Sequence, residues 1–360
     1  MAVILAARRT AVVPRGGAFA RMSLEALAAP VIAAVLADAG LPPGAVDEVI
    51  AANALGAGGN PARRVALAAG LPERVAGLTI DRQCVGGLDA ILLARALVDS
   101  GAARIVLAGG VESYSRRPLR LITDPDGGPP VPYDQPPFTP WPDRDPEMTE
   151  AAAALAERLG LSRAAQEAWA AVSHARTLAV VPPGIVPLSG QARDPFARVL
   201  RPGLLARAPV LAGNVTAATA AVAADAAAFV LVVADAMARP GALRLGPGRT
   251  LGAAPDEPGL APVPAIRAVL QAAGLRPADL AQVELMEAYA AQAMACQHGA
   301  LAGLDPARIN PAGGALARGH PIGASGAILA VHLFHGLKAG HGLAAIAAAG
   351  GLGTALLVQR

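Results

Sequence analysis

Two short segments hold the side chains of this chain that are best suited to chemistry. Cys84 lies in the segment Asp-Arg-Gln-Cys-Val-Gly-Gly-Leu, and His320 lies in the segment Gly-His-Pro-Ile-Gly-Ala-Ser-Gly. Each segment has the pattern of a glycine-rich turn that leads into a helix. A cysteine and a histidine from separate parts of a chain are combined in enzymes that form a covalent acyl intermediate. The two segments therefore predict a site for covalent acyl transfer.

Each of these residues also has a purely structural interpretation. A free cysteine is most often a buried and inert side chain, and a histidine in front of a helix can cap that helix. A cysteine in front of a helix, however, has its thiolate stabilised by the first amides and by the helix dipole. The glycines at 319, 323 and 326 permit a close backbone approach around the histidine. We expect Cys84 to be a nucleophile with a lowered pKa and His320 to be its partner.

The composition argues against several classes of protein. Only 3% of the 360 residues are aromatic and the net charge is +3, so no base-stacking surface for nucleic acid is expected. The longest apolar run, residues 343–358, contains three glycines and is shorter than the roughly 20 residues of a membrane-spanning helix. It predicts two buried strands joined by a turn. The mild positive charge suits an anionic ligand such as a phosphorylated cofactor.

Cysteine and histidine usage predicts a cytoplasmic protein with neither a disulfide framework nor a metal centre. The chain has two cysteines, Cys84 and Cys296. Its six histidines do not cluster as metal ligands. His332 and His335 share a helix face, but no cysteine or carboxylate is close to them in sequence, so a surface position is expected. A dinucleotide-binding domain is disfavoured because no Gly-x-Gly-x-x-Gly follows the first strand.

The chain alternates between strand and helix patterns, which predicts a layered α/β fold. Strands are predicted at residues 2–5, 46–51, 78–80, 104–110 and 229–233, and helices at residues 24–39, 90–97, 149–159 and 162–180. Ser23 before the first helix and Gly40 after it are typical helix caps. Residues 118–146 hold ten prolines, which is typical of a lid, a binding loop or an oligomer contact.

The second half of the chain repeats the order of the first. Residues 281–285 correspond to residues 46–50, and the turn and helix from Gly323 onward correspond to those after Cys84. This repeat predicts a duplicated domain with a pseudo-twofold axis. A cleft between the two halves would bring Cys84 and His320 together. We interpret residues 118–204 as an insertion in the first half.

Ordered motifs over almost the whole chain resemble those of the thiolases, which use a cysteine to make or cleave 3-ketoacyl-CoA. The similar motifs lie at residues 82–88, 108–116, 156–163, 173–174, 262–265, 287–292 and 313–326. The resemblance implies duplicated βαβαβαββ halves in a five-layered αβαβα sandwich with an inserted loop domain. The N-terminal half would comprise residues 1–117 and 205–238, the loop domain residues 118–204, and the C-terminal half residues 239–360.

The resemblance also implies a role for individual residues. Cys84 would carry the acyl group of an acyl-CoA as a thioester, and His320 would activate it. Backbone groups at Cys84, Ala349 and Gly350 would form an oxyanion hole. The substrate pocket would be lined by Met148, Met286, Glu287, Ala221 and Ala347. The implied protein is a homodimer, with a tetramer as the alternative, and it takes coenzyme A thioesters as substrates without a permanently bound cofactor.

Several positions depart from the thiolase pattern. Ala347 stands where the family has a second cysteine, which moves a proton at the α-carbon of the nucleophile. Met286 stands where the family has an asparagine that orients a water, and a thioether cannot donate a hydrogen bond. Thr219 and Ala221 stand where it has an asparagine and a serine beside the pantetheine. The chain keeps the acylation residues and loses those for carbon–carbon chemistry, so weak classical thiolase activity is expected.

Two functions are open from the sequence. One is an acyltransferase in which Cys84 passes its acyl group to CoA or to another acceptor, such as an electron-rich carbon, an amine or a thiol. Cys296 is a less favoured replacement for the missing acid–base residue. The other function is a non-catalytic thiolase-like scaffold or partner subunit. Covalent labelling of Cys84 by an acyl-CoA distinguishes the two.

Overall fold

The computed structural model describes residues 2–56, 58–181 and 184–360. Its main sheet has ten strands, in the order β12-β13-β14-β11-β1-β10-β5-β3-β4 with β2 paired to β10. The first half of the chain provides β1 (Ala2–Arg9), β2 (Val13–Pro14), β3 (Glu48–Ala52), β4 (Ala76–Ile80), β5 (Ile105–Glu112) and β10 (Ala224–Ala234). The second half provides β11 (Leu243–Gly252), β12 (Leu280–Leu285), β13 (His341–Ala348) and β14 (Leu352–Gln359).

The strand pairing confirms the predicted duplication. In the first half β3 is parallel to β5, β5 is antiparallel to β10, and β10 is antiparallel to β1. In the second half β12 is parallel to β13, β13 is antiparallel to β14, and β14 is antiparallel to β11. The first half also has β4, which is parallel to β3. At the corresponding place in the second half, among the described residues, there is a single parallel bridge from Val283 of β12 to Ile309.

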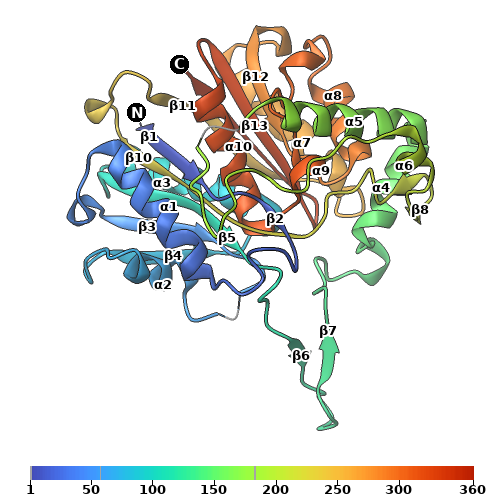
Figure 1. The fold of residues 1–360 in the computed structure, drawn as a ribbon, viewed down its shortest axis with the longest axis horizontal. Coiled ribbons are helices and arrows are strands. Elements are labelled where there is room, and N and C mark those ends of the chain that lie inside the picture. The colour runs from blue at the N-terminus through green and yellow to red at the C-terminus, as the bar shows by residue number, and fades with distance from the viewer. Residues whose placement is uncertain (1, 57, 182–183) are drawn as a thin grey trace.

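Helices divide the molecule into five layers, as expected. On the outer face of the first half-sheet, α1 (Leu24–Ala39) and α2 (Pro61–Ala68) cover one core. On the outer face of the second, α7 (Pro262–Ala273) and α8 (Ala290–Ala300) cover another. Between the two half-sheets, α3 (Gly86–Asp99) and α10 (Ile322–Gly336) form a buried central layer. Figure 1 shows α3 and α10 at the centre of the molecule.

Glycines let the two central helices approach at backbone distance. A Cβ added to Gly326 of α10 would lie 2.4 Å from the backbone nitrogen of Leu88 on α3. A Cβ added to Gly87 of α3 would lie 2.7 Å from the carbonyl oxygen of Gly323. Both distances are shorter than real Cβ contacts, so the packing requires glycine at these positions. The close approach places the N-terminal ends of α3 and α10, and hence Cys84 and His320, beside each other.

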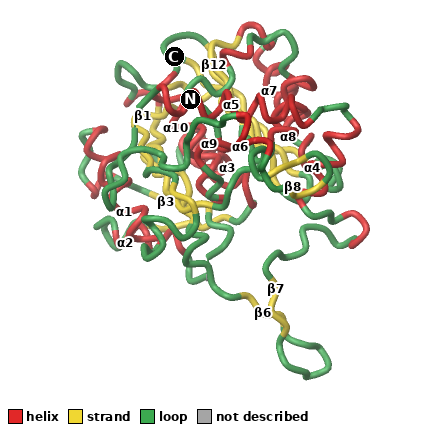
Figure 2. The backbone as a smooth tube through the Cα atoms, turned by 45° about the vertical axis from the view of Figure 1, so that its right-hand side comes forward, coloured by secondary structure: helices red, strands yellow, loops and turns green. Residues whose placement is uncertain are grey.

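The Pro-rich segment and the helices after it lie at the periphery. Figures 1 and 2 show the hairpin of β6 (Arg120–Ile122) and β7 (Val131–Tyr133) projecting away from the body of the molecule. The further elements outside the main sheet and its covering helices are α4 (Met148–Arg158), α5 (Arg163–Ala179), α6 (Pro202–Ala206), β8 (Val210–Ala212), β9 (Val215–Thr216) and α9 (Ala315–Arg318). Of these, β9 and α9 are buried. The domain boundaries expected from the sequence stay a prediction.

A buried ion pair ties the inserted segment to the core. Both guanidinium nitrogens Nη1 and Nη2 of Arg9 on β1 donate to the carboxylate of Asp194 at 2.8 Å. Both side chains are fully buried, and the backbone N–H of Val12 donates to the same carboxylate. This network holds the C-terminal part of the insertion against the end of β1.

The predicted elements agree with the observed ones. Ser23 caps α1 by accepting a hydrogen bond from the backbone N–H of Ala26, and Gly40 ends the helix with a φ of 60°. The strand β10 is buried over ten of its eleven residues, as its apolar run predicts for a strand inside a layered sheet. The helices α2 and α7 were not predicted, although each has an apolar face and a polar face.

Candidate active site

A strained turn presents Cys84 at the start of α3. The strand β4 ends at Ile80, and the carboxylate of Asp81 then accepts a hydrogen bond from the backbone N–H of Gln83 at 3.0 Å. Gln83 has a φ of 49°, in the left-handed region that residues other than glycine rarely adopt. Strain of this kind is concentrated at functional sites. The turn places Cys84 in a short 3-10 helix, Gln83–Val85, that continues directly into α3.

His320 is held between α9 and α10 by its own backbone. Its N–H donates to the carbonyl of Val222 at 2.7 Å, and it forms a bridge with Ala223 just before β10. Gly319, which precedes it, has a φ of 113°, so a side chain at that position would be strained. The imidazole Nε2 lies 3.1 Å from the Sγ of Cys84. The pair predicted from the sequence is therefore in direct contact.

Ser325 fixes the tautomer of His320. Its hydroxyl donates to the carbonyl of Pro321 at 3.1 Å, and its Oγ lies 2.6 Å from Nδ1 of His320. A hydroxyl has a single hydrogen to donate, so Oγ accepts from the Nδ1–H of the imidazole. This hydrogen-bond network assigns the free lone pair to Nε2, which faces the thiol. His320 is therefore set to take a proton from Cys84.

The thiol and the imidazole are both neutral, contrary to the lowered thiol pKa that we expected. Burial raises the pKa of the Cys84 thiol to about 12, although the backbone N–H groups of Cys84 and Ala349 oppose the shift. The buried carboxyl of Glu112 raises it further. Burial also lowers the pKa of His320 to about 4. Desolvation of the thiolate outweighs the favourable helix N-terminus here, because protein surrounds most of the Cys84 side chain, which is only partly exposed toward the cavity.

Glu112 connects the elements of the site. Its carboxylate accepts hydrogen bonds from the side chain of Asn53 at 2.8 Å and from the backbone N–H groups of Ala54 and Gly323 at 3.0 Å. It thereby joins the end of β5 to the loop after β3 and to the first turn of α10. Burial raises the pKa of Glu112 to about 7. The residue positions the helix that follows His320 and does not itself line the cavity.

Two backbone amides converge on the sulfur of Cys84. They are the N–H groups of Cys84 itself and of Ala349. Gly350 and Gly351 form the turn between β13 and β14 with φ values of 73° and 75°. A Cβ on Gly350 would lie 3.0 Å from the carbonyl oxygen of Phe138, so the turn also needs its small size. The two amides can hold the negative oxygen of a tetrahedral intermediate.

A cavity of about 360 Å³ opens onto Cys84 and His320. Of the predicted pocket residues, it is lined by Met148, Ala221, Ala347 and Ala349. Sequence reasoning missed Tyr114, Tyr289 and Thr149, which also line it. The hydroxyl groups of Tyr289 and Thr149 are 3.0 Å apart. Tyr114 and Tyr289 stand in the motifs at residues 108–116 and 287–292, and this position could have indicated a site role from the sequence.

Met286 and Glu287 are not in the wall of this cavity. Met286 lies in the central core with 2% of its surface exposed, because it continues the inward-facing alternation of β12. Glu287 turns toward α5 and accepts hydrogen bonds from the side chains of Trp169, Ser173 and Asn310 at 2.7–3.0 Å. Glu287 therefore joins the insertion to the core. Gly350 acts through the turn geometry and is likewise outside the cavity wall.

Cys296 lies behind the cavity wall. It is fully buried in α8, and its sulfur is 3.4 Å from both the side-chain nitrogen of Gln292 and the carbonyl of Gly259. Burial raises the pKa of this thiol to about 12. Gln292 and Gly259 separate it from the cavity that they line. This placement does not support Cys296 as a replacement for the missing acid–base residue.

The surface position expected for His332 is wrong. Its side chain is 3% exposed, and its Nδ1 lies 3.6 Å from Oε2 of the buried Glu284. The reason is that α10 lies between the two half-sheets, so most of its faces are covered. His335, one turn later, is half-buried, with its Nε2 2.8 Å from the carbonyl of Ala7.

The described residues contain neither a metal cluster nor a membrane-spanning helix. No group of three or more His, Cys, Asp or Glu side chains is arranged to hold a metal ion in the described part of the chain. Among the same residues, no helix has the length and apolar character to cross a membrane. Both cysteines are free thiols.

Known proteins match this chain over nearly its whole length. The family model for the thiolase N-terminal domain matches residues 2–236, and the model for the thiolase C-terminal domain matches residues 244–360. An acetyl-CoA acetyltransferase of Cupriavidus necator is 38% identical to it over 402 residues, and the alignment covers 99% of each chain.

Solved structures have the same fold. The acetyl-CoA acetyltransferase of Bacillus anthracis superposes with a TM-score of 0.91 at 31% identity, covering 99% of this chain and 98% of that one. The Acat5 thiolase of Ascaris suum, solved in complex with coenzyme A, has a TM-score of 0.91 at 27% identity and covers 100% and 99% of the two chains.

Proposed function

This chain belongs to the thiolase family and is an acyltransferase, and from this premise we propose that Cys84 takes the acyl group of an acyl-CoA as a thioester. The observation that carries the proposal is the contact of 3.1 Å between Sγ of Cys84 and Nε2 of His320. Two backbone N–H groups at the same sulfur support it. Coenzyme A in the complex of the Ascaris suum thiolase supports the choice of donor.

The acylation step uses the neutral pair directly. Nε2 of His320 takes the thiol proton as Sγ of Cys84 attacks the thioester carbonyl. The carbonyl oxygen becomes negative, and the N–H groups of Cys84 and Ala349 donate to it. The bond between the carbonyl carbon and the CoA sulfur then breaks, and His320 returns the proton to the leaving CoA thiolate. In the second half-reaction the acyl group passes to CoA or to another acceptor.

We propose that classical 3-ketoacyl-CoA formation and cleavage are weak in this protein. Both reactions need an acid–base group at the α-carbon of the acyl chain. Ala347 lines the cavity next to Cys84 and carries no such group, and Cys296 lies outside the cavity. An acceptor that is already nucleophilic needs no enolisation, which favours an electron-rich carbon, an amine or a thiol as the natural acceptor.

Intact-protein mass spectrometry tests the proposal. The protein is incubated with a panel of acyl-CoA thioesters beside the Cys84→Ala and Cys296→Ala variants. We expect one acyl group to be added to the parent protein and to Cys296→Ala, and none to Cys84→Ala. Absence of an adduct from every thioester would favour the alternative, a non-catalytic scaffold or partner subunit.

We also propose a cytoplasmic homodimer. Support for the compartment comes from the two free thiols, one of which must stay reduced for acylation. Support for the dimer comes from β4, which ends the main sheet and carries Leu78 with 45% of its surface exposed. A sheet edge of this kind is a template for pairing with a second chain.

A further inference from the structure

A second cavity, of about 310 Å³, lies far from Cys84 along α10. His332, which lines it, is 332 − 322 = 10 residues beyond the first residue of α10, or about 15 Å at the rise of an α-helix. Val180, Val181, Pro311 and Ala312 form an apolar wall. Val181 is 58% exposed, so the cavity reaches the surface.

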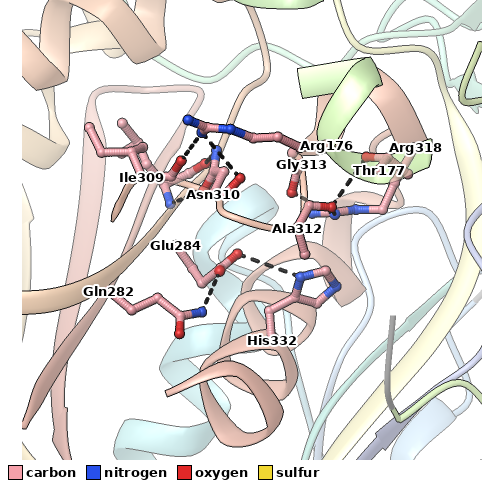
Figure 3. Close-up of polar contacts among 12 residues, drawn as sticks. Arg176, Thr177, Gln282, Glu284, Ile309, Asn310, Ala312, Gly313, Arg318 and His332 are labelled. Carbon is pink, nitrogen blue, oxygen red and sulfur yellow. Dashed lines mark hydrogen bonds and ion pairs between the residues drawn. The ribbon is translucent and has the colours of Figure 1, made fainter. Parts of the chain in front are cut away.

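Polar side chains form the floor of this cavity. Gln282 and Glu284 lie at alternate positions of β12 and line the cavity, whereas Val283 and Leu285 belong to the outer core. The inner face of a buried strand is normally apolar. Figure 3 shows His332 facing Glu284 from α10, with Gln282 on the other side of the carboxylate. The sequence could not reveal this pairing, because 48 residues (332 − 284) separate the two side chains.

Two atoms of the floor lack a hydrogen-bond partner. Gln282 donates to Oε1 of Glu284 at 2.8 Å, but Oε2 of Glu284 and Nε2 of His332 have none within the described residues. The residues are 0% and 6% exposed. With its Nδ1–H directed at the carboxylate, His332 presents Nε2 as an acceptor. Both unpartnered atoms are then buried acceptors, which are costly unless a donor reaches them.

The carboxyl group of Glu284 on the floor titrates near neutral pH. Burial raises the pKa of Glu284 to about 7, while Arg318, Gln282 and Arg9 lower it and Glu287 raises it. Burial, with the charges of Arg318, Arg9 and His335, holds the pKa of His332 well below its ordinary value, so the imidazole is neutral. The neutral ring lies 3.6 Å from Oε2 of Glu284 and so places no positive charge beside the carboxyl group. A cation in the cavity would stabilise the ionised carboxylate.

We infer that this cavity binds a small primary alkylammonium ion. Its NH₃⁺ group donates to Oε2 of Glu284 and to Nε2 of His332, and its alkyl part packs on the wall formed by Val180, Val181, Pro311 and Ala312. An ammonium group has three donors and no acceptor, which matches a floor of two acceptors. The cavity is also large enough for such an ion.

Lys338 lies at the rim of this cavity and carries an ammonium group, as the proposed ligand does. Its Nζ lies 3.4 Å from the carbonyl of His335, and its side chain contributes to the cavity lining. Its ammonium group therefore competes electrostatically with a bound cation. Removing this charge without removing the chain length, by Lys338→Met, is expected to tighten binding of an alkylammonium ion.

Isothermal titration calorimetry of the full chain with n-butylammonium tests the site, with n-butanol as the neutral analogue. We expect saturable binding of the ammonium ion and none of the alcohol. At pH 7 the observed heat should depend on the ionisation heat of the buffer. The reason is that Glu284, with a pKa of about 7, releases a proton when the cation binds. Equal binding of the alcohol, or no binding of the ammonium ion, would overturn the inference.

Variants locate the binding. Glu284→Gln removes the charge at constant size and should weaken binding at least tenfold. Ala312→Leu fills the cavity without touching the polar floor and should abolish binding even if the first variant folds poorly. Glu257→Gln, at a half-exposed carboxylate paired with Arg158, is the matched control and should bind as the parent does. Acylation of Cys84 reports the folding of each variant. Unchanged affinity in both test variants would contradict the site.

Discussion

At the scale of single residues, the chemistry of this site depends on a pair that is neutral before substrate arrives. The thiol of Cys84 and the imidazole of His320 are both largely surrounded by protein, and burial shifts each pKa toward the uncharged form. A preformed thiolate is therefore scarce at neutral pH. In the proposed acylation step the base is therefore Nε2 of His320, whose tautomer Ser325 fixes.

The pH dependence of Cys84 alkylation should reveal this neutral pair. Because burial raises its pKa to about 12, the thiolate fraction grows about tenfold per pH unit up to that value. The rate of alkylation by iodoacetamide should therefore keep rising from about pH 7 to about pH 10, measured against Cys84→Ala. Acylation by an acyl-CoA should change little over the same range, since His320, with a pKa of about 4, is already neutral. A plateau of alkylation below about pH 9 would instead indicate a thiolate–imidazolium pair.

A cysteine at position 347 should restore carbon–carbon chemistry. Ala347 lines the cavity from β13, where a thiol could exchange a proton with the α-carbon of the acyl group. General acid–base catalysis contributes typically 10²–10⁴-fold. We therefore expect Ala347→Cys to raise the rate of acetoacetyl-CoA thiolysis by about 10² or more. The spectrophotometric loss of acetoacetyl-CoA measures it.

A second variant makes that result specific. Ala221→Cys adds the same thiol to the same cavity from another segment and should leave thiolysis unchanged. If both variants gain activity equally, or neither does, the position of the acid–base group is not what limits the parent protein.

The contact between Cys84 and His320 could be predicted from the sequence, whereas the surroundings of the two residues could not. Cys84 and His320 stand in short motifs whose glycines mark the turns that present them. Met286 and Glu287, by contrast, were expected in the pocket and lie in the core and against α5. Their orientation depends on where β12 ends and which neighbour it meets, and one sequence does not contain that information.

At the scale of elements, the site depends on how closely α3 and α10 approach. The repeated pattern in the two halves of the chain predicted that these helices correspond. It did not predict that they would meet at backbone distance around Gly87 and Gly326. The contact joins one helix from each half, so it sets the separation of Cys84 and His320.

A methyl group at this contact should disturb both stability and acylation. In Gly326→Ala the new Cβ would lie 2.4 Å from the backbone nitrogen of Leu88. Overpacking of this kind typically costs 1–3 kcal/mol, and moving α10 also moves His320. We expect a lower free energy of unfolding in urea and slower acylation of Cys84. Gly203→Ala, where no atom lies within 4 Å of the added Cβ, should differ from the parent by at most about 1 kcal/mol. Parent-like values in Gly326→Ala would show that the helices can separate freely.

At the scale of the whole molecule, the two halves have the same order of strands and helices but differ at the outer edge of their half-sheets. The second half closes with a single bridge at Ile309, whereas the first ends in β4, a strand of five residues. The sequence predicted the duplication and the strand patterns of both halves. It could not predict this asymmetry, because a strand reduced to one bridge leaves no periodic pattern to detect.

The exposed edge at β4 and the projecting hairpin offer two separate surfaces for association. Leu78 of β4 is 45% exposed, and Leu119 beside the hairpin is 92% exposed. If two chains pair along β4, a charge at Leu78 would lie at the interface, and edge charges prevent such pairing. Leu78→Lys should therefore elute as a monomer in size-exclusion chromatography with light scattering, while the parent elutes as a dimer or larger.

Leu119→Lys separates the two surfaces. If β4 forms the dimer interface, a contact through the hairpin would join dimers into larger assemblies. Leu119→Lys should then reduce a tetramer to a dimer and leave a dimer intact. A dimer in Leu78→Lys together with a monomer in Leu119→Lys would assign the primary interface to the hairpin. Because β4 leads directly into the turn that carries Cys84, we also expect the monomeric Leu78→Lys protein to acylate more slowly.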